Sequence, residues 1–195
     1  MHDTAPSVIT AWSNFYVITG SSAAALTGLM FVVITLVAGD RTRTTHEGVA
    51  TFSTPTVMHF CAALLVSAIL SAPWLSLTHV AAVLGLVGLC GVVYVTRVLQ
   101  RTRRLTEYRP GIDDWVWFAI LPSIAYVAIL AAAILLPSVP TQALFALAGA
   151  NLLLIFIGIH NAWDVVTYIA IQLPEEPSSP STSEEQRTSA LREPS

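Results

Sequence analysis

Five long apolar segments, in which charged residues are almost absent, dominate the chain. They cover about residues 15–38, 55–77, 80–99, 115–136 and 142–173. About 20 apolar residues, rising 1.5 Å each, cross the roughly 30 Å hydrocarbon core of a bilayer. The sequence therefore predicts an all-α, polytopic membrane protein whose residues 1–173 form a bundle of five transmembrane helices.

Composition excludes an ordinary soluble domain and gives no support to nucleic-acid binding. Only 11% of the residues are charged, against roughly 25% in soluble proteins. The net charge is -3, so the chain has no overall basic character that would favour a nucleic acid as partner. The lipid bilayer is the first partner that the composition predicts.

Prolines and polar residues indicate where the segments begin, bend and end. Thr54 is a plausible N-cap with Pro55 at the first helical position, and the few residues around 76–78 predict a tight hairpin between the second and third helices. Pro122 should bend the fourth helix, with Ser123 compensating for a lost backbone hydrogen bond. The last segment exceeds the bilayer thickness, so its end is expected at the membrane surface.

The two ends of the chain differ from the segments between them. Residues 174–195 are rich in Pro, Ser and Glu and contain no aromatic residue, which predicts a disordered tail. The first eight residues contain no Lys or Arg, so the first helix lacks the positive flank of a cleavable signal and is expected to stay in the mature protein.

Arginines fall only in alternate connections between the predicted helices. The positively charged connections of membrane proteins stay in the cytoplasm, which predicts an outside N-terminus and a cytoplasmic C-terminus. All nine basic residues are Arg, a bias typical of GC-rich genomes, so a bacterial inner membrane is the expected location. The arginines are Arg41 and Arg43, then Arg97, Arg101, Arg103, Arg104 and Arg109, and finally Arg187 and Arg192.

Small residues recur at helical spacing in the first and third segments. Such ridges let helices approach closely in a membrane, where no hydrophobic effect drives their association. Packing within the bundle is the first interpretation, and an interface with a second copy or with a membrane-protein partner is the other. The ridges are Gly20, Ala24 and Gly28, and Gly85, Gly88 and Gly91.

Ionisable and amide side chains near the predicted cytoplasmic boundary are candidates for a functional site, because polar groups are costly in a membrane. His160 and Asp164 lie four residues apart on one helical face, where the carboxylate can orient the imidazole and hold it charged. Structural hydrogen bonding at the helix ends is the first interpretation. The alternatives are a protonatable vestibule, which His160 and Asp164 could line together with His59 and Asn161, or a metal or haem site.

Metal, cofactor and enzyme chemistry find little support in the sequence. No compact HxxxH or CxxC spacing is present, and no pair of nucleophile and base can be named. We therefore predict no metal, no cofactor and no enzymatic activity. Cys61 and Cys90 are interpreted as small buried apolar side chains, and Asn151 as a hydrogen-bonding contact between helices.

Arg97, Arg101 and Arg104 share one face of a helical extension beyond the third segment. Anionic lipid headgroups attract such arginines by roughly 1 kcal/mol each. Determination of topology is the main role expected for them, and headgroup binding is the alternative.

The run FYVITGSSAAALTGLMFVVITL, within residues 12–36, resembles the opening helix of small bacterial multi-helix membrane proteins of uncharacterised function. The DDWVW and HNAWD segments are similar as well. Some of those proteins are labelled as modulators of a membrane-anchored AAA protease, and the resemblance implies a role that depends on a protein partner. The sequence thus favours an accessory or structural membrane subunit, with a proton- or ion-linked channel or transporter as the alternative.

Overall fold

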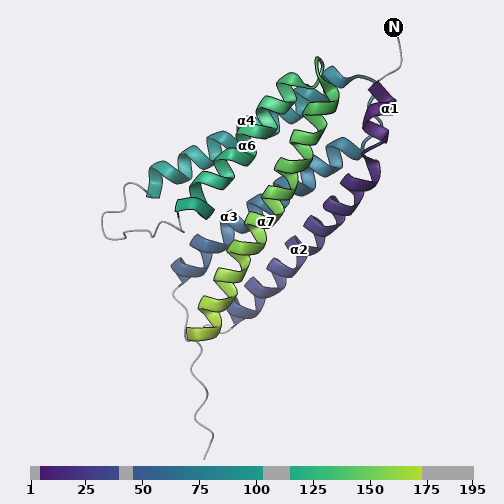
Figure 1. Ribbon diagram of the computed structural model, residues 1–195. Coiled ribbons are helices and arrows are strands. Elements are labelled where there is room, and N and C mark those ends of the chain that lie inside the picture. The colour runs from purple at the N-terminus through teal and green to yellow at the C-terminus, as the bar shows by residue number, and fades with distance from the viewer. Residues whose placement is uncertain (1–4, 40–45, 103–114, 173–195) are drawn as a thin grey trace, which may run out of the picture.

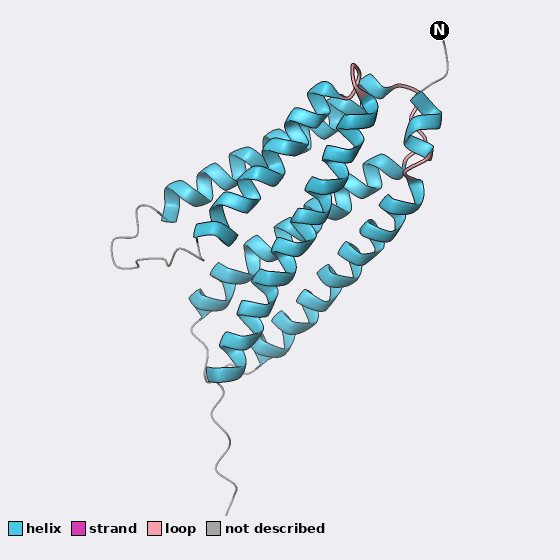
Figure 2. Cartoon of the chain, in the orientation of Figure 1, coloured by secondary structure: helices cyan, strands magenta, loops and turns pink. Residues whose placement is uncertain are grey.

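The computed structural model describes residues 5–39, 46–102 and 115–172, and these are helical with short connections and no strand (Figures 1 and 2). The prediction of an all-α protein is confirmed. The tail predicted to be disordered, residues 174–195, lies outside the described residues. The helices are α1 (Ala5–Thr10), α2 (Ser13–Gly39), α3 (His46–Ser71), α4 (Leu77–Thr102), α6 (Leu121–Leu135) and α7 (Pro140–Gln172), with a π-helical turn, η1 (Val116–Ile120), before α6.

Within these ranges, four helical stretches are long and apolar enough to cross a membrane. They are Ser13–Thr35, Leu77–Gln100, Val116–Leu135 and Pro140–Thr167. The apolar part of α3, Pro55–Ser71, is shorter. A membrane protein with at least these four candidate spans is thus consistent with length and composition.

The second predicted helix has different ends in the structure. Helix α3 begins at His46, so Pro55 lies inside it and not at its first position. Hydropathy indicates only where the apolar residues begin. Helix α3 starts earlier, because its first turns consist of the more polar residues that precede them. The helix ends at Ser71, before the predicted residue 77, because a residue that precedes a proline, here Ala72 before Pro73, disfavours helical geometry. The indole N–H of Trp74 donates to the carbonyl of Ile69 in the last turn.

The fourth predicted helix contains the irregularity expected near Pro122. Its first part is the π-helical turn η1, in which the backbone N–H of Leu121 bonds to the carbonyl of Val116. The hydroxyl of Ser123 donates to the carbonyl of Ala119 at 2.6 Å. A side-chain hydroxyl therefore adds a bond beside the proline, but it bonds to Ala119 and not to the carbonyl four residues before Pro122 whose compensation the sequence predicted.

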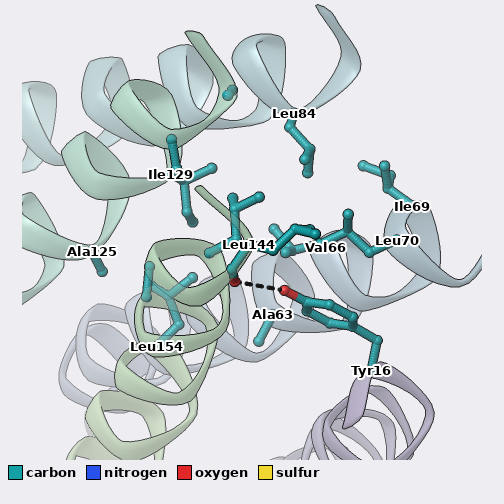
Figure 3. Packing of buried hydrophobic residues seen from close by; sticks show 14 of the residues in the cluster. Tyr16, Ala63, Val66, Ile69, Leu70, Leu84, Ala125, Ile129, Leu144 and Leu154 are labelled. Atoms are coloured by element: carbon teal, nitrogen blue, oxygen red, sulfur yellow. Dashed lines mark hydrogen bonds between the residues drawn. The ribbon is translucent and has the colours of Figure 1, made fainter. Parts of the chain in front are cut away.

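The helices do not pack in the order in which they follow one another in the chain. Helix α3 packs mainly against α2 and α7, and α6 lies between α7 and α4 (Figure 1). The short connection 72–76 joins α3 to α4, yet these two helices contact each other much less than they contact their other neighbours. The core lies among α2, α3, α4, α6 and α7, around large buried side chains such as Tyr16, Leu84 and Leu144 (Figure 3).

Candidate functional site

Three polar side chains meet inside the bundle at the contact of α2, α3 and α7. The amide nitrogen of Asn151 donates to the hydroxyls of Ser67 at 3.0 Å and of Thr19 at 3.2 Å. The two hydroxyls are 3.1 Å apart, and all three residues are buried. The prediction that Asn151 forms a hydrogen-bonding contact between helices is confirmed, and this cluster fixes the register of three helices.

A second polar contact joins α3 to α6. The imidazole Nδ1 of His59 lies 3.0 Å from the hydroxyl of Tyr126, and the His59 side chain is only 2% exposed. The ring of Tyr94, on α4, approaches His59 edge to face with ring centroids 6.5 Å apart. His59 is therefore held by aromatic neighbours within the bundle and does not open onto a vestibule.

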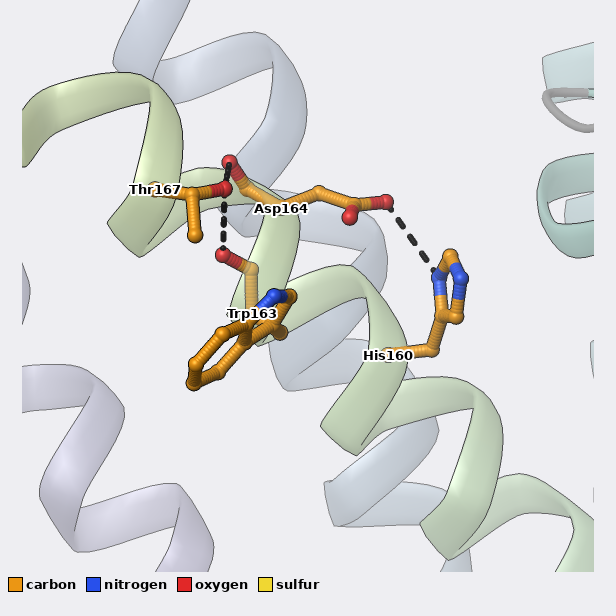
Figure 4. A network of polar contacts seen from close by, with 4 residues as sticks. All are labelled: His160, Trp163, Asp164 and Thr167. Atoms are coloured by element: carbon orange, nitrogen blue, oxygen red, sulfur yellow. Dashed lines mark hydrogen bonds and ion pairs between the residues drawn. The ribbon is translucent and has the colours of Figure 1, made fainter. Parts of the chain in front are cut away.

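His160 and Asp164 form the ion pair that their spacing predicts (Figure 4). Nδ1 of His160 is 3.2 Å from Oδ2 of Asp164, although it makes no aligned hydrogen bond. The imidazole also stacks on the indole of Trp117, with centroids 3.7 Å apart and planes within 10°. Since the side chains of His160 and Asp164 are 35% and 49% exposed, this pair lies at the surface of the bundle.

The four candidate residues of the vestibule thus do not meet at one site, although His160 and Asp164 contact each other. His59 bonds to α6, whereas His160 stacks on η1. Asn161 is fully buried, and neither its amide nitrogen nor its amide oxygen has a hydrogen-bond partner among the described residues. The sequence placed these residues near one boundary of the membrane. Their side chains nevertheless point in different directions, which depend on helix rotation and not on spacing along the chain.

The two glycine ridges also have different surroundings. A Cβ on Gly20 would lie 2.9 Å from Cβ of Ser67, so α2 and α3 are in close contact there. Ala24 is exposed, and Gly28 has nothing within 4 Å. On α4, a Cβ on Gly88 would meet the backbone nitrogen of Leu130 at 2.8 Å.

The other members of the α4 ridge face α6 as well. Gly91 lies directly against the ring of Tyr126, and a Cβ on Gly85 would reach Ala133 at 3.9 Å. The α4 ridge is therefore an internal contact with α6. Only the α2 ridge is divided between an inner and an outer face.

The arginines and cysteines complete the set of candidate residues. Arg97 is exposed near the end of α4, Arg101 lies in its last turn, and Arg104 lies outside the described residues. Both cysteines are exposed, so the interpretation of Cys61 and Cys90 as buried apolar side chains is wrong. Which side of its helix each cysteine lies on depends on helix rotation, and the apolar residues around it in the sequence do not reveal this.

Sequence reasoning missed three residues that the structure makes central. Thr19 and Ser67 complete the cluster around Asn151, and Tyr126 is the partner of His59. The only signal in the sequence is that each is a hydrogen-bonding side chain within an apolar segment. Which of several such residues pair with one another depends on helix packing.

The geometry does not identify an established chemistry. Comparison with known proteins does not supply one either. No family model, no curated protein and no solved structure matches the chain. Across residues 5–39, 46–102 and 115–172, no group of three or more His, Cys, Asp or Glu side chains is arranged to hold a metal ion. The arrangement does provide internal polar contacts between helices and a group of small residues on the outward side of α2.

Proposed function

We propose that the chain is a multi-pass protein of a bacterial inner membrane that acts as an accessory or structural subunit through helix–helix association. The observation that carries this proposal is the outward face of α2. A second copy of the chain or another membrane protein is the partner. The resemblance to small bacterial multi-helix membrane proteins fits a role of this kind.

The outward side of α2 contains a group of small side chains among larger exposed apolar ones such as Ile18, Leu29 and Val32. Ser21, Ala24, Ala25 and Gly28 are all exposed, and they form two pairs at four-residue spacing, Ser21 with Ala25 and Ala24 with Gly28. Without a hydrophobic effect between helices in lipid, close backbone approach is what stabilises their association. Gly28, with nothing within 4 Å, offers room for such an approach.

One substitution tests this face, and another provides a matched control. Gly28→Leu should abolish the complex on native gels and in co-purification from membranes, because the larger side chain holds a partner helix away. Gly149 on α7 is also exposed with nothing within 4 Å, so Gly149→Leu adds the same volume to a different outward surface. Unchanged assembly of correctly inserted Gly28→Leu would reject the proposal.

The proposed topology has five crossings, with the N-terminus outside and the C-terminus in the cytoplasm. The alternation of arginine-bearing connections supports this orientation. The apolar stretch Pro55–Ser71 supports α3 as the fifth crossing, since about 17 residues are the lower limit for a transmembrane helix. Packing of α3 against both α2 and α7 also fits a helix that shares their environment.

Reporter fusions test that topology. A reporter that is active only in the cytoplasm should work after Ala38, Gly111 and Pro174 and should fail after Thr78 and Ser138. Cytoplasmic activity at Thr78 or Ser138 would contradict the five-span orientation.

A proton- or ion-linked channel or transporter is the second candidate, and the His160–Asp164 ion pair is the observation that favours it. Paired ionisable groups near hydrocarbon commonly belong to ion pathways. Purified protein in liposomes should then carry a pH-dependent flux that disappears in His160→Ala and Asp164→Asn. Flux no greater than that of empty liposomes would leave the accessory role as the better account.

A further inference from the structure

A groove of about 330 Å³ lies between α3 and α4, on a different part of the bundle from the small-residue face of α2. Helix α3 contributes Met58, Cys61 and Leu65, and α4 contributes Leu86, Cys90 and Tyr94. The ring of Tyr126 from α6 also lines the groove. The groove exists because α3 and α4 pack mainly against other helices and leave a space between them.

The walls of the groove are apolar and its rim is exposed. Met58, Leu65 and Leu86 are between 42% and 62% exposed, as expected of side chains that face lipid. No charged side chain lines the groove. An occupant must therefore be neutral and must arrive from the hydrocarbon phase, because a charged headgroup would find no counter-charge there.

One end of the groove differs from the other in chemistry. Tyr94 lies towards the Gln100 end of the candidate span Leu77–Gln100, whereas Leu86 lies near its middle. The hydroxyl of Tyr126 is occupied by His59, but the hydroxyl of Tyr94 has no hydrogen-bond partner in the described part of the chain. The groove thus offers a free hydroxyl donor and two aromatic rings at one end, and an apolar slot at the other.

We propose that this groove binds a lipid-soluble quinone. The quinone ring stacks against Tyr94 and Tyr126, a carbonyl oxygen accepts the hydrogen bond of the Tyr94 hydroxyl, and the hydrocarbon tail follows Leu86 and Leu65 towards the membrane centre. Aromatic faces favour a flat ring, and the volume, at the lower end of about 300–1,000 Å³ for small-molecule sites, suits a ring with the first part of a tail. His59 is a positioning residue that holds the Tyr126 ring in place.

The two cysteines provide a direct readout, because both line the groove. Full-length protein in phosphatidylcholine nanodiscs is treated with N-ethylmaleimide, and alkylation of Cys61 and Cys90 is followed separately by mass spectrometry. The probe is a benzoquinone with a decyl tail and a fully substituted ring, to which thiols do not readily add. It should slow alkylation at both positions, and it should not slow alkylation of Ser22→Cys on the outward face of α2.

Two variants and one second probe test the binding mode. Tyr94→Phe should weaken the protection about fivefold, the loss expected for one hydrogen bond of about 1 kcal/mol. Ala62→Phe, which fills the groove from α3, should abolish it. Decylbenzene, which has the tail and a ring but no carbonyl oxygen, should protect much less than the quinone.

The proposal is overturned if the quinone protects neither thiol, or if Tyr94→Phe binds it as well as the original chain. Equal protection by decylbenzene would identify an unspecific lipid-filled groove instead. The α2 face and this groove use different residues, so failure of one proposal does not imply failure of the other.

Discussion

The contact between α4 and α6 and the contact among α2, α3 and α7 hold helices together by different means. At the first, Gly88 and Gly91 bring the backbone of α4 against Leu130 and Tyr126. At the second, Asn151 donates to Thr19 and Ser67. In a membrane, where burial of apolar surface from water does not act between helices, close packing and hydrogen bonding are the two available forces. Both contacts should be sensitive to added volume, since Gly20 also lies close to Ser67, but only the second should be sensitive to the loss of the Asn151 amide.

The largest effect is expected from added volume at the α4–α6 contact. Gly88→Ala places a Cβ 2.8 Å from a backbone atom of Leu130, which a rotamer change cannot relieve. Overpacking of this kind costs about 1–3 kcal/mol, measured as the free energy of unfolding in mixed detergent micelles. Gly85→Ala is the control, since its Cβ would lie 3.9 Å from Ala133, and higher helix propensity should make it neutral or stabilising by about 0.5–1 kcal/mol. Equal stability of the two variants would contradict the close contact.

Removal of the amide at the second contact should have the next largest effect. Asn151→Ala loses two hydrogen bonds, each worth about 0.6 kcal/mol and at most about 1.7 in membrane helices. The amide oxygen has no partner, which lowers the net loss. A double-mutant cycle with Ser67→Ala should show a coupling energy of about 0.5 kcal/mol or more. Strict additivity would mean that the hydrogen bond contributes nothing to stability.

Loss of the bond between α3 and α6 should be smaller. Tyr126→Phe keeps the ring that packs against Gly91 and removes only the hydroxyl bonded to His59. A decrease of about 0.6 kcal/mol in the free energy of unfolding is expected. Tyr94→Phe should leave stability unchanged, because no described residue bonds to that hydroxyl. A decrease for Tyr94→Phe as large as that for Tyr126→Phe would show that the two tyrosines have similar surroundings.

The smallest effect is expected at the surface ion pair. Asp164→Asn removes the carboxylate whose Oδ2 lies 3.2 Å from Nδ1 of His160, but the Asp164 side chain is 49% exposed. Exposed pairs contribute about 0–1 kcal/mol and are screened by salt. The decrease in stability should therefore be barely measurable and should vanish at high salt. If Asp164→Asn lowered the stability as much as Asn151→Ala, the pair would be shielded from solvent and salt.

Periodicity and composition determined the class of the protein. Apolar segments of bilayer length lead to helices because spans of about 20 apolar residues have few other solutions in lipid, and except for α3 the helices extend over nearly the predicted ranges. The irregularity beside Pro122 and the polar contact at Asn151 were also predictable, since each follows from one side chain and its immediate chemistry. The start of α3 was not, because its polar first turns have no hydropathy signal.

Only the tertiary structure decided which residues meet. A vestibule shared by His59 and His160 was one interpretation of the sequence, yet helix rotation directs His59 to Tyr126 and His160 to Trp117. Likewise α3 and α4 are consecutive and closely connected in sequence, but α3 packs on α2 and α7 while α4 packs on α6. The physical reason is that these pairings depend on where glycines such as Gly88 permit close approach and on which polar groups find partners. Close approach and polar pairing each involve two helices, so the residue pattern of a single helix does not predict them.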